Sequence, residues 1–253
     1  NFMCYGNGTI TVDADEPLDT MSQQGDTIPI ESVNTITLGN DPANYSIASM
    51  SLQANLLNVQ AGRRVTMLMF GETEVTNHID VLPQVTLVAT GLLNIRKTTE
   101  ADGEIIMELP LRSNLTAIGV AEDLPWFRVI VPNTDELGWV NQALVNVEGD
   151  ASQLQVVDEN TELLRPFQIM SIATAPDDAP CDGTPDSGVL IQTPNTDSVP
   201  VDMTINNTSF HILGTMLIHA QANADMHTYV LNGQVDVAGE LVPQGAMTTV
   251  QLN

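Results

Sequence analysis

Three of the four histidines recur at equal spacing near the end of the chain, as His211, His219 and His227. Imidazole is a common metal ligand and general base. A β-hairpin centred on Asn223 would place His219 directly opposite His227 on one face of a sheet. Two imidazoles alone make a poor zinc site, because zinc takes three or four protein ligands. We therefore expect a partly exposed cross-strand pair, with a metal or a pH-sensitive contact as the alternative.

The two cysteines, Cys4 and Cys181, suit either a disulfide or a reactive thiol. A nucleophilic cysteine needs a cation or a helix N-terminus to lower the pKa of its thiol. Cys181 has His227 downstream, but it lies in a Pro-Cys-Asp-Gly-Thr-Pro sequence that favours a turn and offers no cation. We expect a Cys4–Cys181 disulfide, formed in an oxidising compartment. Two unpaired thiols remain the alternative.

Two acidic runs bring together carboxylates that calcium could bind. They are Asp13, Asp15, Glu16 and Asp19, and then Asp177, Asp178, Asp182 and Asp186. Neither run has the spaced loop that ends in a bidentate Glu, so we expect solvated loops. The chain also lacks a Gly-x-Ser-x-Gly elbow, a phosphate-binding loop and a His-Glu-x-x-His motif. The sequence thus predicts no catalytic residue, no metal site, no cofactor and no enzymatic activity.

Charge and hydrophobicity exclude two classes of partner. Among 253 residues, 32 are acidic and seven basic, for a formal charge of −25. Nucleic acids and anionic lipids need clustered Lys and Arg, which this chain lacks. No stretch approaches the ~20 apolar residues of a membrane span. The chain begins at Asn1 without a charged leader, as a secreted protein does after signal cleavage. We expect a secreted protein, extracellular or at the cell surface.

Short segments rich in Val, Ile and Thr, separated by Gly, Pro, Asn and Asp, predict an all-β protein. Such segments lie at residues 9–12, 35–38, 47–52, 64–70, 84–89, 127–131, 188–192, 203–205 and 228–231. Shifts in composition predict three modules: residues 1–82, 83–150 and 151–253. A weak internal repeat links the outer two, since Gln-Ala-Asn at 53–55 and at 221–223 is followed by Gly71 and Gly233 in predicted turns.

The middle module resembles the bacterial Src-homology-3 domain over some sixty residues. The resemblance lies in Leu-Asn-Ile-Arg at 93–96, Glu-Ile-Ile at 104–106 with Leu-Pro at 109–110, Thr-Ala-Ile-Gly at 116–119, Leu-Pro-Trp-Phe-Arg-Val at 124–129, and Gly-Trp-Val-Asn at 138–141 with Leu144. It implies a small five-stranded barrel. The chain departs from the family at Lys-Thr-Thr (97–99), in place of Ser-Gly-Pro, and at Ser-Asn (113–114), in place of a turn glycine.

The same resemblance implies a shallow groove for a peptide or a cell-wall stem. Its candidate residues are Asn94, Arg96, Trp126, Trp139 and Asn141. The two tryptophans allow a second interpretation, because an indole supplies a large apolar surface and packs equally well in a core without any ligand. Both interpretations remain open from the sequence.

The last module is similar to the FecR-like β domains found beside such modules in secreted surface proteins of Chloroflexota. The similarity lies in Gly-Val-Leu-Ile-Gln-Thr-Pro at 188–194, Val-Asp-Met-Thr-Ile-Asn at 201–206, and residues 239–245. It implies a barrel between two β-sandwich-like modules.

From these patterns we expect a non-catalytic structural protein whose copies assemble into an extracellular filament or sheath. A free N-terminal strand at residues 9–12, or an unpaired sheet edge, would join a neighbouring copy. The alternative is a surface module that binds peptidoglycan or a peptide in the groove.

Overall fold

The computed structural model describes residues 1–19, 21–39, 45–54, 63–80, 82–134, 136–158, 161, 164–175, 186–194, 200–222 and 224–252. Strands dominate these residues, with two short 3-10 turns, and the predicted all-β class is confirmed. Among them, no helix has the length and apolar content to cross a membrane. The chain divides into two compact units.

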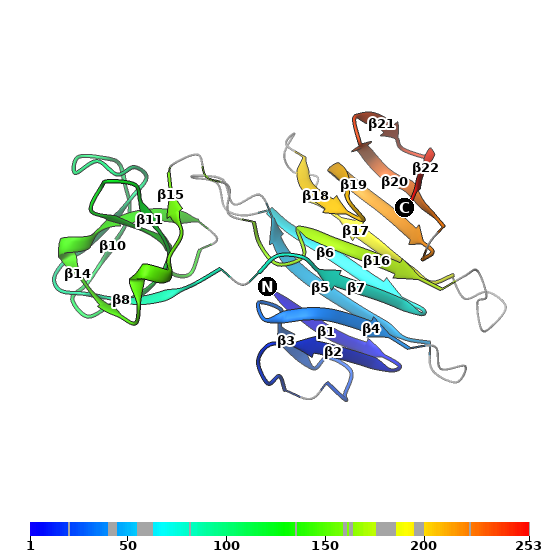
Figure 1. Cartoon of the computed structure of the whole chain (residues 1–253), viewed down its shortest axis with the longest axis horizontal. Helices are drawn as coiled ribbons and strands as arrows, with labels where there is room; N and C mark the ends of the chain where they lie inside the picture. Colours follow the sequence, from blue (N-terminus) through cyan, green and yellow to red (C-terminus); the bar gives the residue numbers. More distant parts are fainter. Residues whose placement is uncertain are drawn as a thin grey trace. The chain divides into compact units, whose positions relative to one another are not determined.

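The first unit combines Asn1–Ala54, Arg63–Asp80 and Leu164–Asn253. Its described residues form fourteen connected strands (Figure 1). They are β1 (Phe2–Asn7), β2 (Ile10–Ala14), β3 (Thr27–Pro29), β4 (Val33–Leu38), β5 (Ile47–Ala54), β6 (Arg63–Phe70), β7 (Thr73–Asn77), β16 (Ile169–Thr174), β17 (Gly188–Gln192), β18 (Val201–Ile205), β19 (Thr208–Ala220), β20 (Asp225–Val237), β21 (Glu240–Pro243) and β22 (Met247–Gln251).

These strands form two layers around one hydrophobic core. The first layer follows the order β2-β4-β7-β16-β18-β19 and the second follows β3-β1-β5-β6-β17-β19. Buried side chains of both layers belong to one cluster, and β18 of the first layer contacts β5 of the second. Alternate residues of each strand enter this core, as a half-buried strand requires. The unit is therefore sandwich-like.

The long hairpin of β19 and β20 passes from one layer to the other. The start of β19 pairs with β18, and its end pairs with β17. Likewise the end of β20 pairs with β21, and its start pairs with β22. Thr193, which follows β17, fills the gap where β19 changes partner. Its hydroxyl accepts a hydrogen bond from the Gly214 N–H at 2.9 Å, and its own N–H donates to the Gly214 carbonyl at 2.9 Å.

The second unit is inserted between two neighbouring strands of the first. β7 and β16 pair antiparallel, yet residues 78–168 separate them in sequence. Asn77 joins the two ends of this insertion: its Oδ1 accepts from the backbone N–H groups of Ile79 (3.1 Å) and Phe167 (2.9 Å). The sequence predicts three modules in series. The structure instead places strands of the outer two in one sandwich, because pairing between distant strands leaves no compositional mark.

The second unit combines Asn55–Gly62 and Val81–Leu163. Its described strands pair in the order β10-β9-β13-β12-β11-β8-β14, with β15 beside β11. They are β8 (Val85–Ala89), β9 (Leu93–Arg96), β10 (Ile105–Leu109), β11 (Asn114–Ala121), β12 (Trp126–Ile130), β13 (Leu137–Asn141), β14 (Val145–Glu148) and β15 (Val156–Val157), with 3-10 turns η1 (Gln142–Leu144) and η2 (Ala151–Gln153). The sheet curls around its own core. The Src-homology-3 barrel remains a prediction.

One half of the predicted internal repeat is present in the structure. β5 and β6 form the first hairpin, and Gly71 makes a turn before β7 with a φ of 69°. β19 and β20 form the second hairpin. The predicted turn at Gly233 is wrong, because Gly233 lies inside β20. Its positive φ serves the bend of this long strand rather than a reversal of the chain.

Candidate interaction surface

The two tryptophans of the predicted groove are buried in the second unit. Trp126 is 5% exposed and Trp139 is fully buried. They share a small cluster with Val157 of β15, which lies beside β11 so closely that a Cβ on Gly119 would come within 2.6 Å of the Val157 side chain. A residue of β15 thus belongs to the same buried cluster as both indoles. This burial favours the core-packing interpretation of both indoles.

Arg128 extends the buried cluster with a cation. Its guanidinium carbon lies 4.8 Å from the centre of the Trp139 ring, and the side chain is 3% exposed. A desolvated guanidinium over an indole gains a cation–π interaction. The Trp139 Nε1 has no hydrogen-bond partner among the described residues. Arg128 was not among the candidate residues from sequence, because nothing local marks which strand lies beside β13.

Two of the other three candidate groove residues, Asn141 and Arg96, hold a turn and a loop of the second unit. Asn141 Oδ1 accepts from the Ala143 N–H at 3.0 Å and so caps η1. Arg96 Nη1 donates to the Gly103 carbonyl at 2.5 Å, which ties the loop after β9. The buried Asn94 Oδ1 has no partner in the described part of the chain. Arg96 lies opposite Trp139 in the strand register, so those two candidates are neighbours.

The proposed disulfide falls partly outside the described residues. Cys4 lies on β1, half-buried, between Ser49 of β5 and Thr27 of β3. Cys181 lies in a segment outside the described residues, so the Cys4–Cys181 pairing stays a prediction. Asp177, Asp178 and Asp182 of the second acidic run also lie outside the described residues. Among the described residues, no group of three His, Cys, Asp or Glu side chains could hold a metal ion.

The predicted histidine pair is confirmed: His219 is the register partner of His227 across the β19–β20 hairpin. The His219 Nδ1 lies 2.7 Å from the Ser187 carbonyl, and its ring meets Tyr229 edge-on. The His227 Nδ1 lies 3.0 Å from Thr249 Oγ1. Each imidazole thus has its own partner.

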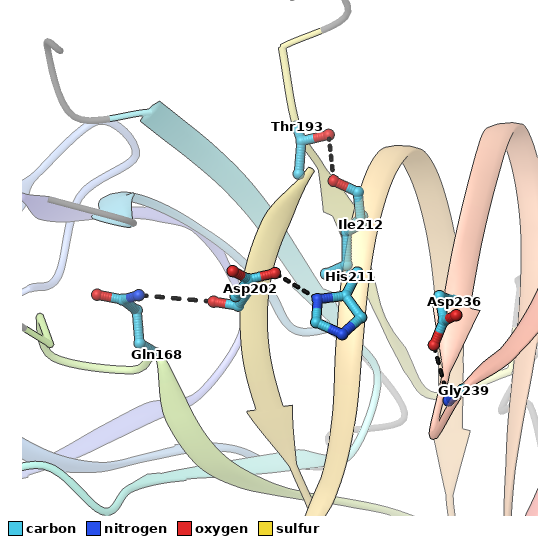
Figure 2. Close-up of polar contacts among 7 residues, drawn as sticks. All are labelled: Gln168, Thr193, Asp202, His211, Ile212, Asp236 and Gly239. Carbon is cyan, nitrogen blue, oxygen red and sulfur yellow. Dashed lines mark hydrogen bonds and ion pairs between the residues drawn. The ribbon is translucent and has the colours of Figure 1, made fainter. Parts of the chain in front are cut away.

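The third histidine, His211, lies between two aspartates on neighbouring strands (Figure 2). Asp202 of β18 and Asp236 of β20 are its register partners. The His211 Nδ1 lies 2.5 Å from Asp202 Oδ1, while Asp236 Oδ1 accepts from the Gly239 N–H at 2.8 Å. The hydrogen bond with Asp202 raises the pKa of His211, desolvation opposes it, and the charges of Asp202 and Asp236 add to the rise. This row is an exposed charge cluster on the first layer.

The outward faces of the two layers differ in charge. The outward face of the first layer, called the acidic face, carries Asp13, Glu74, Asp202 and Asp236 among threonines and serines. The outward face of the second layer, called the charge-poor face, consists of Ser49, Ser51, Arg64, Thr66, Leu68, Leu190, Gln192, Thr215, Leu217, His219, Asp225, His227, Tyr229, Met247, Thr249 and Gln251. Arg64 and Asp225 are its two formally charged residues.

An apolar row crosses the charge-poor face. Each member is the register partner of the next, on five neighbouring strands. The row runs Leu68, Leu190, Leu217, Tyr229 and Met247. The first four are half-buried, and Met247 is 50% exposed. Because alternate residues on the same strands fill the core, these side chains lie on the outer surface of the layer. A row of this kind on an otherwise acidic protein makes this face a candidate interaction surface.

Sequence reasoning missed this surface, although a signal was present. Val189-Leu190-Ile191 and Met216-Leu217-Ile218 are continuous apolar runs. Strands with one wet face alternate apolar and polar residues, whereas continuous runs are typical of strands covered on both faces.

Comparison of the chain with family models, with curated proteins and with solved structures finds no match.

Proposed function

We propose that the protein is a secreted, non-catalytic structural protein whose copies assemble through the charge-poor face into an extracellular filament or sheath. The observation that carries this proposal is the apolar row on that face of a chain with a formal charge of −25. Two copies with so many acidic groups repel each other, and bringing carboxylates into an interface costs desolvation energy. Contact is therefore most favourable where carboxylates are fewest.

The charge-poor face has the extent that a specific interface needs. It spans six neighbouring strands, β5, β6, β17, β19, β20 and β22, over up to about five residues of each. With strand spacings of ~4.8 Å and ~3.3 Å per residue, this is roughly 29 Å by 17 Å, or ~490 Å² in projection. Side-chain relief adds to that area, so the face approaches the ~800 Å² per partner of a standard interface.

The alternative function, a groove for peptidoglycan or a peptide, has less support. A ligand would have to reach Trp126 and Trp139, which lie in one buried cluster with Val157 of β15. Binding at these rings would require the cluster to open and would expose its buried side chains to water.

A matched pair of substitutions tests the assembly. Leu217→Glu places a carboxylate in the middle of the apolar row, and Leu241→Glu places one on β21, where Leu241 is 59% exposed and outside the row. Sedimentation velocity over a range of NaCl and CaCl₂ concentrations, with negative-stain microscopy, should show assemblies for the wild type and Leu241→Glu. Leu217→Glu should form no filaments or other large assemblies while keeping its circular dichroism spectrum. A wild type that remains monomeric in every condition would contradict the proposal.

A further inference from the structure

The four edge strands of the sandwich differ in how they are protected against pairing with another chain. Within the described residues, β2, β3, β21 and β22 each have a strand on one side alone. Exposed edges usually carry charges or proline, which block a further strand. β2 carries Asp13, β3 ends in Pro29, and β21 contains Glu240 and Pro243. β22, with the sequence Met-Thr-Thr-Val-Gln, has neither a charge nor a proline.

The composition of β22 favours pairing with a further strand. A segment of high β propensity, low charge and no proline is the type that adds to a sheet edge. In a chain where 32 of 253 residues are acidic, a five-residue edge with none is the least repulsive place for a second acidic molecule. β22 also borders the charge-poor face, to which it contributes Met247, Thr249 and Gln251.

The hydrogen bonds of β22 show which of its backbone groups lack an intramolecular strand partner. Val230 donates to the Ala246 carbonyl at 3.0 Å, and Leu252 donates to the Ala224 carbonyl at 3.1 Å. Antiparallel pairs alternate between hydrogen-bonded and non-hydrogen-bonded, so the even-numbered residues of this segment face β20. The N–H and C=O groups of Met247, Thr249 and Gln251 therefore point away from β20.

We infer that β22 pairs antiparallel with β22 of a second copy, about a two-fold axis beside Thr249. In this register Thr249 pairs with Thr249 of the second copy, and Met247 pairs with its Gln251. All three outward-pointing residues then form hydrogen-bonded pairs, and every outward backbone group of the strand gains a partner. A two-fold contact of this kind is closed, because the same edge is used on both molecules. It also places both charge-poor faces on the same side of one continuous sheet.

Pairing of β22 with another edge of a second copy is less favourable. β3 offers three residues and ends in Pro29, which has no N–H to donate. β21 offers Glu240 and Pro243, and β2 would bring Asp13 beside the joined strands. Each of these contacts leaves a missing donor or a carboxylate at the seam, whereas the self-pairing of β22 leaves neither.

This inference rests on the proposed function and names its first step: the assembling unit is a dimer, and the apolar row joins dimers to one another. Thr249→Pro tests it, because proline removes an outward-pointing N–H while the even-numbered residues keep their bonds to β20. The substitution also removes the contact of Thr249 with His227. Thr249→Val is the matched control, since it loses the same hydroxyl but keeps the N–H.

All proteins in this experiment carry Leu217→Glu, so that association through the charge-poor face is absent. Sedimentation equilibrium should then give a dimer both when Thr249 is retained and when Thr249→Val is added. Thr249→Pro in that background should weaken dimerisation by at least about 30-fold, the loss expected for two backbone hydrogen bonds. Amide hydrogen exchange of Met247, Thr249 and Gln251 should slow as the protein concentration rises.

Two outcomes separate this inference from the proposed function. If the wild type assembles while Thr249→Pro assembles equally well and the three amides exchange at a concentration-independent rate, β22 pairing is wrong and the proposed function stands. If the wild type is monomeric at all concentrations, both are wrong. Dimers that never grow into larger assemblies would support β22 pairing and contradict the filament.

Discussion

Gly214 and Gly233 lie directly opposite each other at the point where β19 and β20 pass from one layer of the sandwich to the other. Both have positive φ angles, 137° and 76°. A Cβ on Gly214 would lie 2.1 Å from the Asn232 carbonyl oxygen, and one on Gly233 would lie 2.1 Å from the Leu213 oxygen. The two glycines thus allow the backbones of β19 and β20 to approach closely where the hairpin passes between the two layers.

Gly214→Ala should therefore destabilise the first unit severely, because the added methyl meets backbone that cannot move aside. We expect a loss of more than about 3 kcal/mol in the free energy of unfolding, measured by urea denaturation. Gly239→Ala is the matched control: Gly239 has a φ of 89° but nothing within 4 Å of its Cβ position. That variant should lose about 1 kcal/mol from backbone strain alone. Equal losses in the two variants would show that close approach is not the reason for glycine at position 214.

Asn77 secures the place where the second unit leaves and rejoins the sandwich. Its Oδ1 accepts from Phe167 and Ile79, and its Nδ2 donates to the Ile79 carbonyl at 2.8 Å. Asn77→Ala leaves those N–H groups without this acceptor, so we expect a loss of about 1–3 kcal/mol. Hydrogen exchange should show the loss in β7 and β16, with the core strands of the second unit unchanged. Uniform loss across both units would contradict a local role.

The sequence predicts local structure better than long-range pairing. Strands at 47–52 and 188–192, and the position of His219 opposite His227, follow from alternation and a turn centre, which are local signals. The insertion between β7 and β16 depends on a contact across some ninety residues, which no local pattern reports. The predicted turn at Gly233 is wrong because glycine occurs both in turns and at bends within strands.

The candidate site was harder to predict than the fold. For Trp126 and Trp139 the sequence leaves a groove and a core position open, and their burial in one cluster with Val157 of β15 favours the core. The continuous apolar runs at 189–191 and 216–218 are a local signal for outward apolar residues, but the row itself depends on the register of five strands.

His211 makes the free energy of unfolding depend on pH. Its folded pKa is raised, first by the hydrogen bond to Asp202 and then by charge, with Asp236 adding less. A raised pKa means that protonation stabilises the fold. That contribution is complete below the unfolded value near 6.5 and is lost as the pH rises through the folded pKa. Nuclear magnetic resonance titration should show a larger fall in the His211 pKa in Asp202→Asn than in Asp236→Asn. The reverse order would contradict the assigned cause.

Trp139 should act as a structural anchor of the second unit. The side chain is fully buried, and Arg128 stacks on its ring. Trp139→Ala removes the ring and leaves a cavity beneath a buried guanidinium, so we expect a loss of about 3–5 kcal/mol. The loss should appear in the melting of the second unit, while exchange in the strands of the sandwich stays as in the wild type.

A cell-wall pull-down supplies the deciding comparison for Trp139. If Trp139→Ala melts like the wild type and loses binding to purified peptidoglycan, the residue contacts a ligand, and its buried cluster must open to expose it. If stability falls as expected while Val156→Lys, at a 62% exposed position of β15, leaves both folding and any cell-wall binding unchanged, the indole is core. The burial of Trp139 in one cluster with Val157 favours the second result, because exposing that cluster would place buried apolar surface in water.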